Sequence, residues 1–125
     1  MSRRERDGRV RPGRVRGDEI VVIRWRDIPA QVNGRRGDER HQVVLPRRFQ
    51  RSIDEAAMHA GKKTANEYIA EWRRESRALD PGVDLRAAVD AIAAGFEAAL
   101  SREALQRFVA ADGWDPDRSG EPTDG

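Results

Sequence analysis

Residues 40–60, RHQVVLPRRFQRSIDEAAMHA, decide the fold class because the hydrophobic period changes within them. Up to Leu45 polar and apolar residues alternate, which predicts a β-strand over residues 40–45. From Pro46 onward apolar residues recur at helical spacing: Phe49, Ile53, Ala56, Ala57 and Ala60. A proline suits the start of a helix, where the backbone N–H has no partner inside the helix to lose. The stretch therefore predicts a strand followed at once by a helix.

The segment before this stretch predicts further pieces of sheet. Residues 19–25, EIVVIRW, are rich in β-branched side chains and bounded by turn formers, which indicates a strand. Residues 27–29, DIP, should interrupt it, because proline cannot donate to a sheet ladder. We expect residues 30–32 to resume as a short edge strand, and residues 33–38, with two glycines, to form a turn.

The segment after the stretch predicts three more helices. Thr64 opens a capping box, and the apolar pattern that follows it continues a second helix through Trp72. Asp84 and Ser101 can cap a third and a fourth helix within residues 84–111. The predicted fold class is therefore α+β, an antiparallel β-hairpin or three-stranded meander packed on three to four helices.

Length and charge predict one domain with polar ends. A chain of 125 residues has room for a single domain, which we place over residues 18–114. Residues 1–17 hold seven arginines against two acids (7 − 2 = +5), and residues 112–125 hold five acids against one arginine (1 − 5 = −4). Because both ends have few apolar side chains to bury, residues 1–17 should be a disordered arginine-rich arm and residues 115–125 a disordered acidic tail.

The residue types argue against catalysis and cofactor binding. The chain has no cysteine and two histidines, His41 and His59, which are too few for an ordinary metal site. No pair of carboxylates lies in an apolar stretch, and no glycine-rich loop opens a helix as a phosphate cradle does. We therefore expect a non-enzymatic protein without catalytic residues, metals or cofactors. The absence of cysteine and of an apolar leader favours a cytoplasmic location.

Residues 25–32, WRDIPAQV, are the segment that most resembles a recognition site. A large aromatic side chain, a charge pair and a proline lie together where a strand ends, and Trp and Arg often anchor protein interfaces. The candidate interaction surface consists of Trp25, Arg26, Asp27, Gln31 and Trp72, the last beside the corner or beneath it in the core. In the alternative interpretation, Trp25 and Ile28 fill the core while the charge pair shapes the turn.

This segment also carries a family resemblance. WRDIPAQV, followed by LPRRFQRSIDEAAMHAG and TANEYIAEWRR, resembles the bacterial virulence-factor domain family, a small domain that also occurs in proteins called conserved virulence factor C. The resemblance covers roughly residues 20–74, and residues 1–17 and 78–125 lie outside it. In related proteins the domain is joined to a scaffold-like module of iron–sulfur assembly and to helical repeats. The resemblance therefore implies a small bacterial accessory or adaptor protein that acts through protein–protein interaction.

A second resemblance implies a different class of function. A strand, Pro46, a helix, a short basic loop and a capped helix are together similar to a ribbon-helix-helix DNA-binding unit, in which two chains pair their strands into a ribbon that enters the major groove. Arg40 and Gln42 would then contact bases, and the arginine-rich arm would contact phosphates. The partner is a protein under the first interpretation and nucleic acid under this alternative, and neither involves a membrane.

Overall fold

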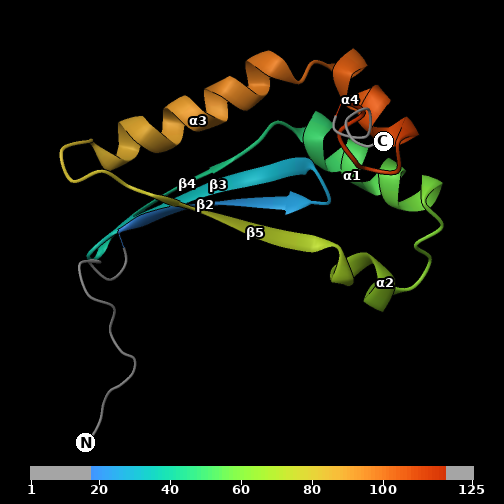
Figure 1. The fold of residues 1–125 in the computed structure, drawn as a ribbon, viewed down its shortest axis with the longest axis horizontal. Coiled ribbons are helices and arrows are strands. Elements are labelled where there is room, and N and C mark those ends of the chain that lie inside the picture. Colours follow the sequence, from blue (N-terminus) through green and yellow to red (C-terminus); the bar gives the residue numbers. More distant parts are fainter. Residues whose placement is uncertain (1–17, 118–125) are drawn as a thin grey trace, which may run out of the picture.

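The computed structural model describes residues 18–117, which form an antiparallel sheet and a set of helices (Figure 1). Within these residues the strands are β2 (Glu19–Trp25), β3 (Ile28–Arg36), β4 (Glu39–Val44) and β5 (Trp72–Ala78). The strand order is β4-β3-β2-β5, and every neighbouring pair is antiparallel. The α+β prediction is confirmed. The arginine-rich arm, residues 1–17, and the chain beyond residue 117 lie outside the described residues.

The described helices cover one side and one end of the sheet. They are α1 (Arg47–His59), α2 (Ala65–Ala70), α3 (Leu85–Ala99) and α4 (Arg102–Ala110). α3 lies along one face, against β3 and β4, while α1 and α4 pack on each other at one end (Figure 1). On the opposite side of the sheet α2 lies next to the start of β5, and none of the described helices covers the rest of that face (Figure 1). We call this opposite side the open face.

The core lies between the sheet and helices α1, α3 and α4. Its largest fully buried side chains include Trp25, Ile28, Phe49, Ile53, Leu85 and Leu105. Four of these six side chains come from α1, α3 and α4, and burying each stabilises the fold by about 1.5–3 kcal/mol. None of the helices within the described residues is long and apolar enough to cross a membrane.

The predicted helix starts are confirmed by their hydrogen bonds. The Thr64 side chain accepts from the Glu67 N–H at 3.1 Å, and the Glu67 carboxylate accepts from the Thr64 N–H at 3.2 Å, which completes the capping box. Asp84 and Ser101 cap α3 and α4, and each side chain accepts from the N–H three residues later. Local side-chain chemistry therefore fixes where three of the helices begin.

β3 is longer than predicted, and it is not an edge strand. The expected short edge strand at residues 30–32 and turn at residues 33–38 are wrong: β3 runs between β2 and β4, and only residues 37–38 form the turn. Pro29 does not end the strand, because a bulge shifts the β2–β3 register beside it. The central part of the sheet therefore extends through a segment whose composition is typical of a loop.

Packing against α3 explains why a glycine stands at position 34 of this strand. A β-carbon at this position would overlap Val89 Cγ2 and lie 2.7 Å from Leu85 Cδ1, both on α3. Glycine is therefore needed so that α3 can approach the middle of the sheet, which is one of the uses of glycine inside a strand. The Asn33-Gly34 pair suggests a turn in the sequence, but its glycine serves helix–sheet packing instead.

β5 takes the place of the end of the predicted second helix. α2 ends at Ala70, and β5 pairs antiparallel with β2 along its whole length. The prediction of a helix through Trp72 is therefore wrong, and the sheet has one strand more than the predicted meander. β5 reads WRRESRA, which is polar at most positions, so no alternation of apolar and polar residues marks it as a strand.

Candidate interaction site

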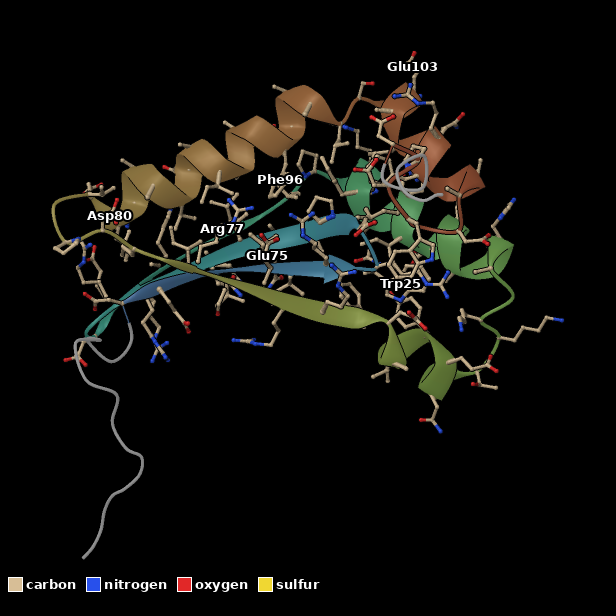
Figure 2. The ribbon with its side chains drawn as sticks, in the orientation of Figure 1. Trp25, Glu75, Arg77, Asp80, Phe96 and Glu103 are labelled. Atoms are coloured by element: carbon tan, nitrogen blue, oxygen red, sulfur yellow. The ribbon has the colours of Figure 1, made fainter. Side chains whose placement is uncertain are left out.

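The candidate surface predicted from the sequence centres on Trp25, which the structure places in the core. Its side chain is fully buried, and its Nε1–H donates to the carbonyl oxygen of Tyr68 at 2.8 Å. The Trp25 and Tyr68 rings stack with centroids 5.9 Å apart, and Trp72 meets Tyr68 edge-on at the same centroid distance. Figure 2 shows Trp25 at the end of the sheet near α1. Trp25 is therefore a core anchor, out of reach of a partner.

Arg26 is also enclosed. It turns the chain from β2 into β3 with a φ of 53°, in the left-handed region that non-glycine residues seldom adopt. Its guanidinium lies 5.2 Å from the ring centroid of Trp25 and 5.1 Å from that of Trp114. It donates to the carbonyl oxygen of Asp112 at 2.9 Å and to the Glu71 carboxylate at 3.2 Å. Arg26 thus joins the β2–β3 turn to the segment after α4.

The contact with Arg26 changes the acidity of Glu71. The hydrogen bond from Arg26 holds the pKa of the Glu71 carboxyl below its ordinary value, although partial burial opposes this shift. Lys62, whose Nζ lies 3.5 Å from the second carboxylate oxygen, lowers the pKa further. Glu71 is therefore ionised at neutral pH and forms an ion pair with a largely buried guanidinium.

Asp27 attaches the segment after α4 to the same turn. The Asp27 carboxylate accepts from the Asp115 N–H at 2.8 Å, and the Asp27 N–H donates to the Gly113 carbonyl oxygen at 2.9 Å. Arg73 of β5 lies 3.5 Å from the other carboxylate oxygen. These contacts extend into the segment that the sequence assigned to the tail. Arg26 and Asp27 together hold this segment against the sheet, and we call these two residues the clasp. Their role in the structure is therefore to stabilise the fold.

Of the remaining two candidates, Gln31 lies apart from this clasp, whereas Trp72 pairs with Trp25 in the β2–β5 register. Gln31 lies in the middle of β3 on the open face, and Trp72 is half-buried at the start of β5. The five predicted residues therefore do not form one exposed surface. The positions of Trp25 and Ile28, both fully buried, agree with the alternative in which they fill the core.

A groove that the sequence did not indicate lies beside the clasp, between β5 and helices α3 and α4; we call it the β5 groove. Its volume is about 470 Å³, and its apolar floor consists of Phe96, Ala99, Leu100 and Phe108. Figure 2 shows Phe96 on the side of α3 that faces the sheet, above Glu75. Since α3 packs mainly on β3 and β4, it leaves the side of the sheet near β5 uncovered. The sequence predicts the helix that carries Phe96, but only β5 makes this part of the helix one wall of a groove.

The charges at the rim of the β5 groove are paired with one another. Arg24 Nη2 lies 2.8 Å from the Glu75 carboxylate, and Arg77 Nε lies 3.3 Å from its second oxygen. The Arg24 guanidinium also lies 5.2 Å from the ring centroid of Phe96. Burial acts to raise the pKa of the Glu75 carboxyl, but the two arginines outweigh it and leave this pKa below its ordinary value. The groove is therefore an apolar floor beside a network in which two arginines share one carboxylate.

The two DNA-contact candidates lie on the open face. Arg40 and Gln42 are exposed on β4 and border a hollow of about 320 Å³ that Arg35 and Arg74 also line. Arg40 lies opposite Arg35 in the β3–β4 register. Arg74 comes from β5, so sequence reasoning that missed this strand could not place it here. The open face therefore gathers three arginines from three strands.

The described residues hold no cluster of three or more His, Cys, Asp or Glu side chains that could bind a metal ion. Each histidine instead faces one carboxylate. His41 Nε2 lies 2.8 Å from Asp90, which joins β4 to α3, and His59 Nδ1 lies 2.7 Å from Asp112, which joins α1 to the segment after α4. Both pairs connect elements of the fold, and the expectation of a non-enzymatic protein stays a prediction.

Comparison with known proteins gives one match. Residues 23–109, well over half of the 125-residue chain, match the model of the family described as virulence factor. The match runs from β2 to α4, so residues 78–109, which the resemblance left outside, are part of it. Neither the curated proteins nor the solved structures contain a match. The chain belongs to the virulence factor family.

Proposed function

We propose that this protein is a non-enzymatic accessory module of the bacterial cytoplasm that binds an extended segment of a partner protein in the β5 groove. The observation that supports the proposal is an apolar floor that lies directly beside an edge strand. No described strand pairs with the outer edge of β5, so its backbone N–H and C=O groups are available to an added strand.

The groove also restricts the chemistry of the segment. In strand addition, main-chain hydrogen bonds supply affinity, and the side chains on one face, at every second position, supply specificity. A segment paired with β5 would direct one set of side chains over Phe96, Leu100 and Phe108. Because Arg24 and Glu75 already neutralise each other, the rim does not require a charged occupant. The partner segment therefore carries apolar side chains at alternate positions.

Substitution at Ala99 tests this proposal. Ala99 is exposed and lines the groove, so Ala99→Arg would place a long charged side chain over the apolar floor without removing core packing. Ala98 is exposed but does not line the groove, which makes Ala98→Arg the matched control. The full-length protein and both variants would be screened against a library of short peptides from a bacterial proteome. Affinity would be measured by fluorescence anisotropy, and β5 would be followed by amide hydrogen exchange.

We expect the enriched peptides to alternate apolar and polar residues and to protect the β5 amides from exchange. They should bind the Ala99→Arg variant at least about tenfold more weakly, a loss of about 1.4 kcal/mol, and the Ala98→Arg variant as well as the wild type. The proposal fails if both variants bind equally, if β5 exchange is unchanged, or if the library yields no binder.

The ribbon-helix-helix alternative stays a prediction, and the width of the sheet favours a nucleic acid other than duplex DNA. Arg40 and Gln42 are exposed, and no described strand pairs with the outer edge of β4, as a two-chain ribbon requires. However, β3 flanks β4, so pairing across a twofold axis would give a ribbon at least four strands wide. Four strands span about 14 Å, more than the ~12 Å width of the major groove.

A further inference from the structure

The pairing register sets the pattern of side chains on the open face, because paired residues on neighbouring strands point to the same side. From β4 toward β5, three successive rows read Arg40, Arg35, Glu19 and Ala78; Gln42, Asn33, Val21 and Ser76; and Val44, Gln31, Ile23 and Arg74. Arginines thus lie at opposite corners of the face, and three side-chain amides lie between them.

The positive charge of this face is only partly compensated. Glu19 is the one acidic residue in the three rows, and its carboxylate lies 3.9 Å from Arg35. Within the described residues no carboxylate lies within ion-pair distance of Arg40 or Arg74, and both are exposed. A guanidinium with free N–H groups in a planar fork is suited to phosphate oxygens. The face therefore offers two phosphate contacts at its corners.

The sequence before β2 is also positively charged. Residues 1–17 carry a net charge of +5 by sequence, and the chain after them enters the fold at β2, whose first residue, Glu19, borders the hollow. The described chain therefore begins at the end of the face that carries Arg35 and Arg40. The net charge of +5 in residues 1–17 favours a polyanion over a neutral or cationic ligand.

We propose that the open face binds single-stranded nucleic acid, with phosphates on Arg40 and Arg74 and base edges on the amides of Gln42 and Asn33. Amides both donate and accept hydrogen bonds, as base edges do, whereas the carboxylate side chains of an acidic peptide only accept them. The sheet is too wide to enter a major groove face-on, but the unstacked bases of a single strand can lie flat on it. This surface lies on the other side of the sheet from the β5 groove, so each site can be tested without the other.

The test removes the two corner charges. Full-length protein would be titrated into a fluorescein-labelled oligouridine of about 12 nucleotides, a length typical of single-strand sites, at several salt concentrations. The Arg40→Gln/Arg74→Gln variant would be compared with Arg51→Gln/Arg86→Gln, which removes the same charge from exposed positions on α1 and α3. The arm is intact in every protein, so its attraction cancels. Circular dichroism would confirm that both variants fold, and a duplex of the same length and polyglutamate would serve as competitors.

We expect the Arg40→Gln/Arg74→Gln variant to bind at least about tenfold more weakly than the wild type at low salt. The plot of log affinity against log salt has a negative slope, and its magnitude should decrease by about 1.4, because each phosphate contact contributes about 0.7. The control variant should change affinity by less than about twofold. Equal losses of affinity in the two variants would show that the binding is general charge attraction, which would contradict the proposed site. The proposal would also be wrong if the duplex or polyglutamate competed as strongly as unlabelled oligouridine, since the face would then bind duplex or acidic protein.

Discussion

Replacing Arg26 with alanine is expected to destabilise the fold more than any change at an exposed arginine. Arg26 lies between two tryptophan rings and holds Glu71 and the carbonyl oxygen of Asp112. Its side chain is 11% exposed and that of Glu71 is 24% exposed, so the ion pair is largely shielded from water. The substitution would leave the Glu71 carboxylate with Lys62 as its remaining cationic partner.

The magnitude follows from these contacts. Removing one partner of a fully buried ion pair costs about 3–5 kcal/mol, and the partial exposure of Glu71 lowers that cost. A hydrogen bond to a charged group contributes about 1.5–3 kcal/mol, and a shielded cation–π contact adds about 0.5–2 kcal/mol. Because these contributions overlap in one guanidinium, we expect a loss of about 3 kcal/mol at pH 7. Arg51→Ala, at an exposed position of α1, should cost less than about 0.5 kcal/mol.

The loss should depend on pH with a defined sign. Arg26 lowers the pKa of Glu71 in the folded state, so the ion pair stabilises the fold above the unfolded pKa of about 4.3 and is lost as pH falls through the lowered folded value. The wild type should therefore lose stability faster than Arg26→Ala between about pH 5 and pH 3. The difference between the two proteins is then largest near neutral pH and smaller in acid.

Urea unfolding followed by tryptophan fluorescence, at pH 7 and at pH 3, measures this difference. A loss below about 1 kcal/mol at pH 7, or a loss that does not change with pH, would refute the assignment of Arg26 as the clasp. Arg26→Gly provides an internal check of the backbone argument. It loses the same side-chain contacts but relieves the positive φ, so it should be more stable than Arg26→Ala by about 1 kcal/mol.

Three further substitutions test other parts of the fold. Gly34→Ala should cost about 1–3 kcal/mol, because the new methyl group would overlap Val89 and push α3 off the sheet, and a chemical denaturation midpoint equal to the wild type would contradict this packing. Thr64→Ala should cost about 1 kcal/mol, seen as faster amide exchange in α2. Trp25→Phe should cost about 2 kcal/mol, since it removes both volume and the donor to Tyr68, and a thermal midpoint unchanged within error would argue against that hydrogen bond.

Local sequence patterns predicted the fold class, several strands and helices, and part of the core of this protein. The period change at Pro46 located β4 and α1, and the caps at Thr64, Asp84 and Ser101 located the other helix starts, because capping hydrogen bonds reach only three residues along the chain. Trp25 and Ile28 could be assigned to the core as one of two alternatives, and their complete burial agrees with that one. The α+β class followed from these elements.

Tertiary structure decided the features that depend on contacts distant in sequence. β5 is a strand because it pairs with β2, about fifty residues earlier, and its polar residues carry no periodic signal of their own. Asn33 and Gly34 lie in a strand because they pair with β2 and β4, and the missing side chain at Gly34 lets α3 pack closely there. Both candidate sites depend on β5, which borders the groove and brings Arg74 to the open face. The sequence shows which residues these sites could contain but not which of them lie close together. Strand pairing and helix–sheet packing bring together residues that no short-range pattern connects.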